Sequence, residues 1–277
     1  MNNQKLGNRR YLWQAGSGPT VVFLHGTGGA VEWVDSEIHM AHFAKVNGWT
    51  LAYPAGLPPD PRKPMGFLSN PNRWNDGSTS EIDPHHSTSD DVAFLDAVFD
   101  DLVRHGSDPA RLVLAGFSNG AGMTFRFAAE GRTRLAAIIC VAGHCWIDPA
   151  PLARPVSTLY MIGDHDPLIP VAGGEVRIPW GNRVVTRPPV SHSLAKWARA
   201  NQCDPNPVTS VDASGLMVSH YAGAVPGVTF RSVVIPGLGH HWPGGAGQLN
   251  PRLGGPKHSP ILANQWIQSF LREQGVG

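Results

Sequence analysis

A serine flanked by two glycines stands where a strand-like segment passes into a helical one. The segment reads Gly116 Phe117 Ser118 Asn119 Gly120, and this G-x-S-x-G spacing is typical of a sharp turn that exposes a nucleophilic serine. Glycine two residues before and after the serine leaves room for the backbone in such a turn. Because the start of a helix favours negative charge, the motif predicts Ser118 as a nucleophile for acyl transfer.

A second glycine-rich turn follows the apolar run that ends at Leu24. Its residues, His25 Gly26 Thr27 Gly28 Gly29, resemble the His-Gly loop that donates a backbone N–H to the oxyanion in esterases. We expect the donors to be the amides of Thr27 and Asn119, and we expect His25 to anchor the loop. A phosphate-binding loop is the competing interpretation, but neither the Lys-Ser/Thr ending nor the G-x-G-x-x-G spacing is present.

A serine nucleophile needs a histidine base, and the base needs a carboxylate that fixes its tautomer. Asp164 and Asp166 follow one strand-like run, and His240 and His241 follow a later one. The order serine, acid, histidine is the order found in α/β-hydrolases. Each candidate lies just past the carboxyl end of a predicted strand, where open α/β sheets place their sites.

The elements that must position these residues alternate between strand-like and helix-like segments without a linker. We therefore expect an α/β fold with a mostly parallel central sheet and helices on both faces, forming a single domain over residues 1–277. A stretch at about 171–190 lacks a clear period and predicts an irregular excursion near the sheet edge. The expected strands are 20–24, 49–53, 111–115, 136–141, 157–162, 216–222 and 228–235, and the expected helices are 91–103, 119–130, 191–201 and one that closes the chain after Pro260.

Composition excludes several classes of function. Only 16 % of the residues are charged and the formal net charge is +1, so we expect neither nucleic acid nor a membrane as a partner. The longest apolar run, Leu135 to Ala142, is far shorter than the roughly 20 residues that span a bilayer. Without a signal peptide the chain is expected in the cytoplasm, or in a secreted or periplasmic location if a leader has been removed. Core or loop thiols are the default for the three cysteines, although a Cys140–Cys145 bridge is an alternative.

At this point the sequence resembles the polyhydroxybutyrate depolymerase and feruloyl esterase family of α/β-hydrolases. The similarity runs from about residue 20 to residue 245, and its most specific mark is Gly239 His240 His241 Trp242 Pro243 Gly244. The resemblance implies that His240 is the base and that Asp166, rather than Asp164, is the acid. Residues 73–77 and 171–190 match only loosely, and they are expected to border the acyl and alcohol pockets.

These motifs predict a serine esterase that works through an acyl-enzyme without a metal or cofactor. Adjacent histidines such as His85 and His86 do not share one face of an element, which argues against a metal site there. Four tryptophans are candidates near the expected mouth: Trp74, Trp146, Trp180 and Trp242. We assign Trp74, Trp180 and Trp242 to substrate binding, although we expect at least half of the four to have a core role, since tryptophan is usually largely buried. Expected substrates are short-chain, hydroxyalkanoate-oligomer and feruloyl or aryl esters. An acyltransferase, a peptidase and a catalytically silent binding protein are the alternatives, and the sequence does not indicate an oligomeric state.

Overall fold

A computed structural model describes residues 1–81, 83, 86–180 and 183–277. Its centre is a ten-stranded sheet with the strand order β1-β2-β4-β3-β5-β6-β7-β12-β11-β10. The strands are β1 (Asn2–Leu6), β2 (Arg9–Gln14), β3 (Thr20–Leu24), β4 (Thr50–Pro54), β5 (Leu112–Phe117), β6 (Ala137–Val141), β7 (Ser157–Gly163), β10 (Val208–Val211), β11 (Met217–Tyr221) and β12 (Phe230–Ile235).

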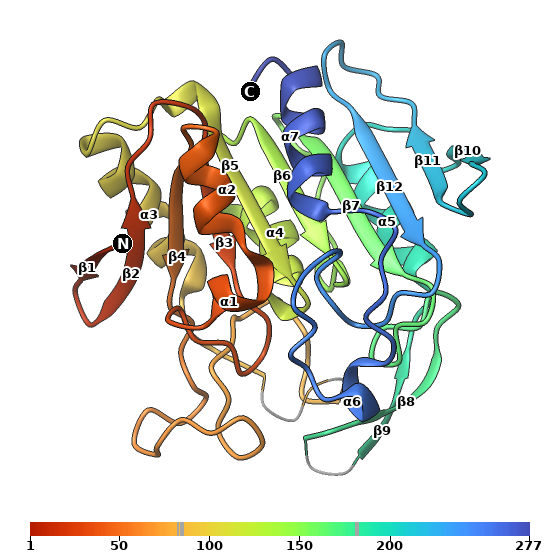
Figure 1. Ribbon diagram of the computed structural model, residues 1–277, viewed down its shortest axis with the longest axis horizontal. Coiled ribbons are helices and arrows are strands. Elements are labelled where there is room, and N and C mark those ends of the chain that lie inside the picture. The colour runs from red at the N-terminus through yellow and green to blue at the C-terminus, as the bar shows by residue number, and fades with distance from the viewer. Residues whose placement is uncertain (82, 84–85, 181–182) are drawn as a thin grey trace.

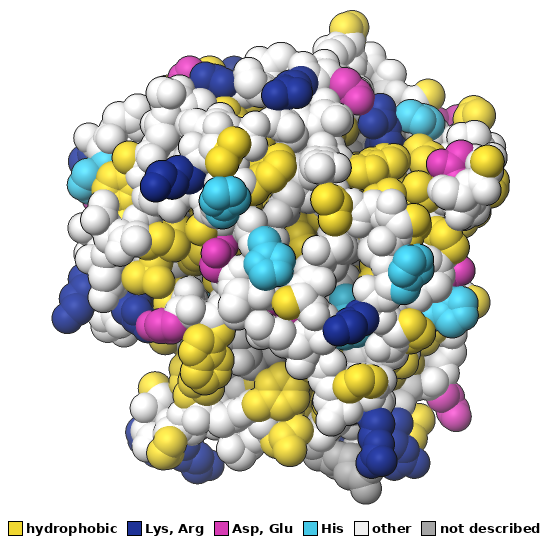
Figure 2. Space-filling model, viewed as in Figure 1, with side chains coloured by type: hydrophobic (Ala, Val, Ile, Leu, Met, Phe, Trp, Pro, Cys, Tyr) yellow, Lys and Arg dark blue, Asp and Glu magenta, His cyan; other side chains and the backbone are white. Residues whose placement is uncertain are grey.

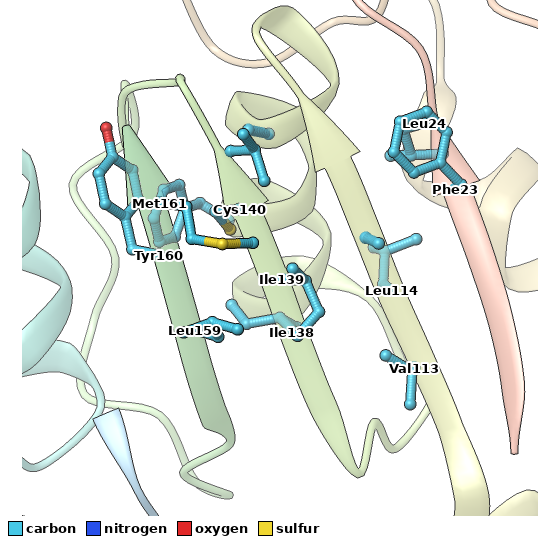
Figure 3. Close-up of a cluster of buried hydrophobic side chains, with 14 of the residues drawn as sticks. Phe23, Leu24, Val113, Leu114, Ile138, Ile139, Cys140, Leu159, Tyr160 and Met161 are labelled. Carbon is cyan, nitrogen blue, oxygen red and sulfur yellow. The ribbon is translucent and has the colours of Figure 1, made fainter. Parts of the chain in front are cut away.

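The six central strands, from β4 to β12 in this order, run parallel, and the strands outside them pair antiparallel. Strands β3 to β7 consist of buried residues throughout, with Phe117 at the end of β5 as a partly exposed exception. Such strands need apolar side chains on both faces because helices cover both sides of a parallel sheet. Figure 3 shows the resulting core, in which aliphatic and aromatic side chains of β3, β5, β6 and β7 pack side by side.

Helices cover both faces of the sheet (Figure 1). Helices α1 (Val34–Ile38), α2 (Met40–Val46) and α7 (Ala263–Glu273) lie in front, and α3 (Asp91–Arg104), α4 (Asn119–Glu130) and α5 (Val190–Ala200) lie behind. Ring contacts join the rear helices, with Phe99 of α3 stacked on Phe127 of α4 and Phe125 of α4 against Trp197 of α5. The expected mostly parallel sheet with helices on both faces is confirmed.

Residues 171–190 were expected to form an irregular excursion, and this prediction is wrong for the two strands that the structure places there. It contains a two-stranded antiparallel hairpin, β8 (Gly174–Ile178) and β9 (Arg183–Arg187). Buried and exposed residues alternate over only a few positions: Val176, Ile178 and Val185 are buried, while their neighbours within the two strands are exposed. Residues 181 and 182 of this stretch lie outside the described residues.

The carboxyl ends of the central parallel strands meet at the lower edge of the sheet in Figure 1. The loop of residues 57–73, the β8–β9 hairpin and α6 (Pro251–Gly254) gather at this edge. Figure 2 shows hydrophobic side chains over much of this view of the molecule, including its lower part, among acidic and basic side chains.

No helix in the described part of the chain has the length and apolar composition needed to cross a bilayer. Cys140, Cys145 and Cys203 are all buried and free, so the alternative of a Cys140–Cys145 bridge is not what the structure holds.

Candidate active site

Ser118 lies at the turn between β5 and α4, in a backbone conformation that residues other than glycine rarely adopt. Its φ is 56° and its ψ is −119°, which places a non-glycine residue in strained backbone territory. The two flanking glycines explain how the chain tolerates this turn. A Cβ on Gly116 would overlap the backbone of Gly120, and a Cβ on Gly120 would overlap the backbone of Leu24. The turn therefore holds the serine hydroxyl beyond the end of the sheet.

Ser118, His240 and Asp166 are joined by a line of hydrogen bonds. His240 Nε2 lies 2.9 Å from Ser118 Oγ, and His240 Nδ1 lies 2.7 Å from Asp166 Oδ2. These three residues follow β5, β7 and β12, whose carboxyl ends are close together in the sheet. The ring of Phe117 packs against the imidazole with centroids 4.9 Å apart. The structure thus brings together the three residues that the sequence predicted as a triad.

Asp166 is held independently of the histidine that it contacts. Its Oδ1 accepts hydrogen bonds from the amides of Leu168 (2.9 Å) and Ile169 (2.8 Å), and the residue is 3 % exposed. Asp164 has different partners, because its Oδ1 lies against His165 Nδ1 and the amide of Gly237. The neighbouring histidine, His241, directs Nε2 to the carbonyl of Gly255 at 3.2 Å. Asp166 and His240 are therefore the pair in contact with the serine.

The glycine-rich loop after β3 lies against the serine turn. The amides of Gly28 and Gly29 are occupied by the carbonyls of Asn72 and Gly26, whereas no such bond is found for the amide of Thr27 among the described residues. Asn119 is the first residue of α4, and the first amides of a helix have no acceptor within it. Neither of the two amides predicted to stabilise an oxyanion donates to another group in the described part of the chain.

His25 holds this loop in place through both ring nitrogens. The amide of Gly56 donates to Nε2 at 3.0 Å, so Nδ1 carries the proton and donates to the carbonyl of Gly26 at 2.8 Å. Burial lowers the pKa of His25 to about 4, which keeps the ring neutral in this arrangement. The expected anchoring role fits these contacts.

Comparisons with known proteins place this chain in a family. Residues 15–180, more than half of the chain, match the Phospholipase/Carboxylesterase family. The chain belongs to this family. It is also 27 % identical over 267 residues to "Putative esterase NocK" of Nocardia uniformis subsp. tsuyamanensis, covering 91 % of this chain and 74 % of that protein.

Solved structures share the fold of this carboxylesterase-family chain. An acetyl xylan esterase from Aspergillus awamori superposes with a TM-score of 0.59 at 14 % identity, covering 98 % of this chain and 95 % of that one. Arabidopsis thaliana SOBER1 gives a TM-score of 0.55 at 13 % identity, covering 93 % and 99 %. Family membership and the esterase relative support carboxylic ester hydrolysis as the reaction class. They do not assign the chain to the polyhydroxybutyrate depolymerase and feruloyl esterase group.

Two of the three tryptophans assigned to substrate binding are buried in this carboxylesterase-family fold. Trp74 is 0 % exposed and lies beneath the glycine-rich loop, where its Nε1 donates to the carbonyl of His25 at 2.9 Å. Trp242 is 2 % exposed and packs edge-on against Phe23 with centroids 5.2 Å apart. Neither residue lines the cavities beside Ser118. Their assignment is wrong because proximity in sequence to a site motif does not decide which way a side chain points.

Trp180 does line the cavities beside Ser118. It follows β8, and its Nε1 donates to the carbonyl of Phe67 at 2.7 Å. Phe67 itself packs against Gly28, where a Cβ would overlap its ring. The hairpin and the loop of residues 57–73 therefore meet over the glycine-rich loop.

The larger cavity is an apolar cleft of about 560 Å³ that opens at Ser118. Its walls come from the glycine-rich loop, α1, the loop of residues 57–73 and the region of α6. The hydrophobic side chains that line it include Phe23, Trp33, Val34, Ile38, Phe67, Leu68, Phe117, Leu168, Trp180, Leu249 and Leu253. A cleft of this volume accepts the apolar part of a small ester.

A smaller cavity of about 40 Å³ lies on another side of Ser118, and sequence reasoning missed most of its polar lining. Asp76, His144 and Arg187 line it, together with Trp146. Asp76 and Arg187 belong to residues 73–77 and 171–190, the two segments that match the polyhydroxybutyrate depolymerase and feruloyl esterase family only loosely. The sequence could have indicated His144 as a site residue, since it follows the carboxyl end of β6. It could not have indicated Arg187, because the hairpin that holds it was not predicted.

The described residues contain no group of three or more His, Cys, Asp or Glu side chains placed to hold a metal ion. Of the two adjacent histidines considered at the sequence level, His85 lies outside the described residues.

Proposed function

We propose that this chain hydrolyses carboxylic esters through an acyl-enzyme formed on Ser118. The observation that carries the proposal is the line of hydrogen bonds from Asp166 through His240 to the serine hydroxyl, at 2.7 and 2.9 Å. These distances lie within the range that a nucleophile and its general base require.

The steps follow from this geometry. His240 Nε2 removes the proton of Ser118 as Oγ attacks the ester carbonyl, and Asp166 stabilises the imidazolium that forms. The amides of Thr27 and Asn119 stabilise the oxyanion of the tetrahedral intermediate. His240 then protonates the leaving alcohol, and a water molecule activated by the same histidine releases the acid. The reaction uses no metal or cofactor.

The proposed substrates are short-chain, hydroxyalkanoate-oligomer and feruloyl or aryl esters, as for the polyhydroxybutyrate depolymerase and feruloyl esterase group. The apolar cleft supports an aliphatic or aromatic group on one side of the ester. Trp180 at its edge limits the length of that group, so p-nitrophenyl acetate and butyrate should have higher specificity constants than the palmitate ester.

Replacing the nucleophile tests the proposal. Ser118→Ala should lower p-nitrophenyl acetate hydrolysis by roughly 10⁴-fold or more and abolish labelling by a fluorophosphonate probe, because no other group can form the acyl-enzyme. An unchanged thermal transition would show that the variant is folded. A folded variant that keeps a tenth of the wild-type activity would remove Ser118 from this role. Wild-type protein that neither hydrolyses esters nor reacts with the probe would overturn the function itself.

A further inference from the structure

The small cavity beside Ser118 differs in chemistry from the apolar cleft. It has a volume of about 40 Å³ and shares Thr27 and Ser118 with the cleft, but charged and polar side chains form much of its wall. A cavity needs a volume of roughly 10–15 Å³ to hold one water molecule. The cavity therefore has room for a group of only a few non-hydrogen atoms next to the reacting bond.

Arg187, the last residue of β9, brings an unpaired positive charge to this cavity. Its Nε is buried without a hydrogen-bond partner, and its guanidinium forms no ion pair with any described residue. The contact that it does make is with the ring of Trp146, 5.3 Å from the guanidinium carbon. Burial lowers the pKa of Arg187, opposed by the charges of Asp83 and Asp76. The residue as a whole is partly exposed, but a charge that has lost part of its hydration and has no direct partner costs free energy that a bound anion would offset.

His144 contributes a second unsatisfied group to the same wall. Its side chain is fully buried, and its Nδ1 lies 2.9 Å from Ser193 Oγ. Its Nε2 has no partner among the described residues. Burial lowers the pKa of His144 to about 3, so the ring is neutral. When the Ser193 hydroxyl donates to Nδ1, Nε2 carries the proton and is a hydrogen-bond donor.

The acidic residues of the cavity already have partners. Asp83 forms an ion pair with buried Arg73 at 2.5 Å. Asp76 accepts from both the amide and the hydroxyl of Ser78, at 3.1 and 2.6 Å, and burial raises its pKa. Arg187 is thus the charged lining residue of the cavity without a direct partner among the described residues.

We propose that this cavity binds a carboxylate group of the substrate and that Arg187 selects it. The inference rests on the proposed function and narrows its substrate class to esters with a free carboxylate close to the scissile bond. A guanidinium offers several donors in a planar array that matches a carboxylate. The carboxylate can come from the acyl side, as in half-esters of short dicarboxylic acids, or from the alcohol side, as in acylated short hydroxy acids.

Matched substrates that differ only in charge test this selection. The acyl arm compares monoethyl glutarate with ethyl glutaramate, and the alcohol arm compares 3-acetoxybutyrate with 3-acetoxybutyramide. The wild type should prefer the carboxylate over the carboxamide by roughly 10–100-fold in specificity constant in one arm, the value of a hydrogen bond to a charged group. The arm that shows the preference identifies the source of the carboxylate.

Three variants complete the experiment. Arg187→Met should bring the carboxylate-to-carboxamide ratio close to one, and Arg187→Lys should keep part of it because the charge remains. The matched control is Arg183→Met at the other end of β9, where the exposed side chain donates to the carbonyl of Ser80 at 3.2 Å. This variant should leave the ratio at its wild-type value.

An inhibition constant adds a measure of carboxylate binding that does not depend on how fast the charged substrates are hydrolysed. Glutarate should inhibit p-nitrophenyl acetate hydrolysis competitively in the wild type and at least tenfold more weakly in Arg187→Lys. The proposal is overturned by a wild type without carboxylate preference in either arm, or by an Arg187→Met ratio equal to that of the wild type. A wild type inactive on every ester, including p-nitrophenyl acetate, would instead contradict the proposed function.

Discussion

The side chain of Asn119 forms two hydrogen bonds with the backbone of Trp74. Asn119 Oδ1 accepts from the Trp74 amide at 2.7 Å, and Asn119 Nδ2 donates to the Trp74 carbonyl at 3.0 Å. Because Asn119 directly follows Ser118, this pair fixes the residue whose own amide we assign to the oxyanion. A buried tryptophan, rather than a substrate contact, thus helps to orient the site.

The buried ring of Trp74 holds this backbone against the glycine-rich loop through its bond to the His25 carbonyl, so Trp74→Phe should reduce stability and turnover without weakening substrate binding. The variant loses the hydrogen bond to the His25 carbonyl and part of a fully buried ring, which should lower the free energy of unfolding by about 2–4 kcal/mol. We expect kcat to fall and KM to stay within about twofold. Chemical denaturation and steady-state kinetics measure these quantities. Trp180→Phe is the matched control, because its ring lines the cleft and its KM should change. A tenfold rise of KM in Trp74→Phe with unchanged stability would show that the buried ring contacts substrate.

The two aspartates after β7 should differ strongly in their effect on turnover. Asp166→Asn removes the carboxylate that orients His240 and should lower kcat by about 10³ to 10⁴. Asp164→Asn should stay within roughly tenfold of the wild type, because Asp164 contacts His165 and Gly237 instead of the base. Kinetics with p-nitrophenyl butyrate measure both variants, and the reverse ranking would assign the acid to Asp164.

Stability should fall in acid partly because His144 is buried as a neutral ring. Its pKa in the folded protein, about 3, is below the ordinary value of about 6.5. Between these values the unfolded chain binds a proton that the native protein does not, so stability decreases as pH falls below about 6.5. By pH 4.5 this single histidine should account for about 2–3 kcal/mol.

His144→Gln isolates that contribution. Urea denaturation at pH 7.5 and pH 4.5 should show that the wild type loses about 2–3 kcal/mol more than the variant between the two conditions. Any effect of the substitution at pH 7.5 cancels in this comparison. Equal losses in the two proteins would mean that His144 is not the group that takes up the proton.

Two adjacent arginines should have very different effects on stability. Arg9 is 8 % exposed and pairs with Asp91 at 2.5 Å, whose other oxygen accepts from the amide of Asn75 at 2.6 Å. Arg9→Ala leaves a buried carboxylate unpaired and should cost about 3–5 kcal/mol. Arg10 forms a more exposed pair with Glu32, so Arg10→Ala should cost less than about 1 kcal/mol. Denaturation curves at neutral pH compare the two, and similar losses would contradict the assigned importance of burial.

The sequence predicts well those parts of the fold that depend on a local pattern of residues. Thr20–Leu24 and Asn119–Glu130 have the predicted bounds, because one is a continuous apolar run and the other starts at a motif with fixed geometry. The edge strands β1 and β10 were not predicted, since most or all of their residues are exposed and they pair only with a neighbouring strand.

The site likewise contains residues that local sequence patterns indicated and residues that they did not. Ser118, Asp166 and His240 follow core strands, so chain order and position at strand ends reduced the acid to Asp164 or Asp166 and the base to His240 or His241. The family resemblance then selected Asp166 and His240. Arg187 lies on a hairpin whose place in the fold depends on contacts with residues more than 100 positions earlier, such as the bond from Trp180 to Phe67. A pattern of neighbouring residues in the sequence does not predict a contact between segments this far apart. For the same reason the sequence could not distinguish buried Trp74 from cleft-lining Trp180.

The hydrogen bond between Trp180 and Phe67 joins two insertions that lie outside the central sheet. One insertion is the loop of residues 57–73, between β4 and α3, and the other is the β8–β9 hairpin, which begins after Asp166 and ends before α5. The nucleophile, acid and base lie closer to the ends of core strands. The reactive centre and the walls that choose its substrate are thus built from separate stretches of the chain. Exchange of both walls together, with their shared bond preserved, is accordingly a route by which one hydrolytic centre can be adapted to a different ester.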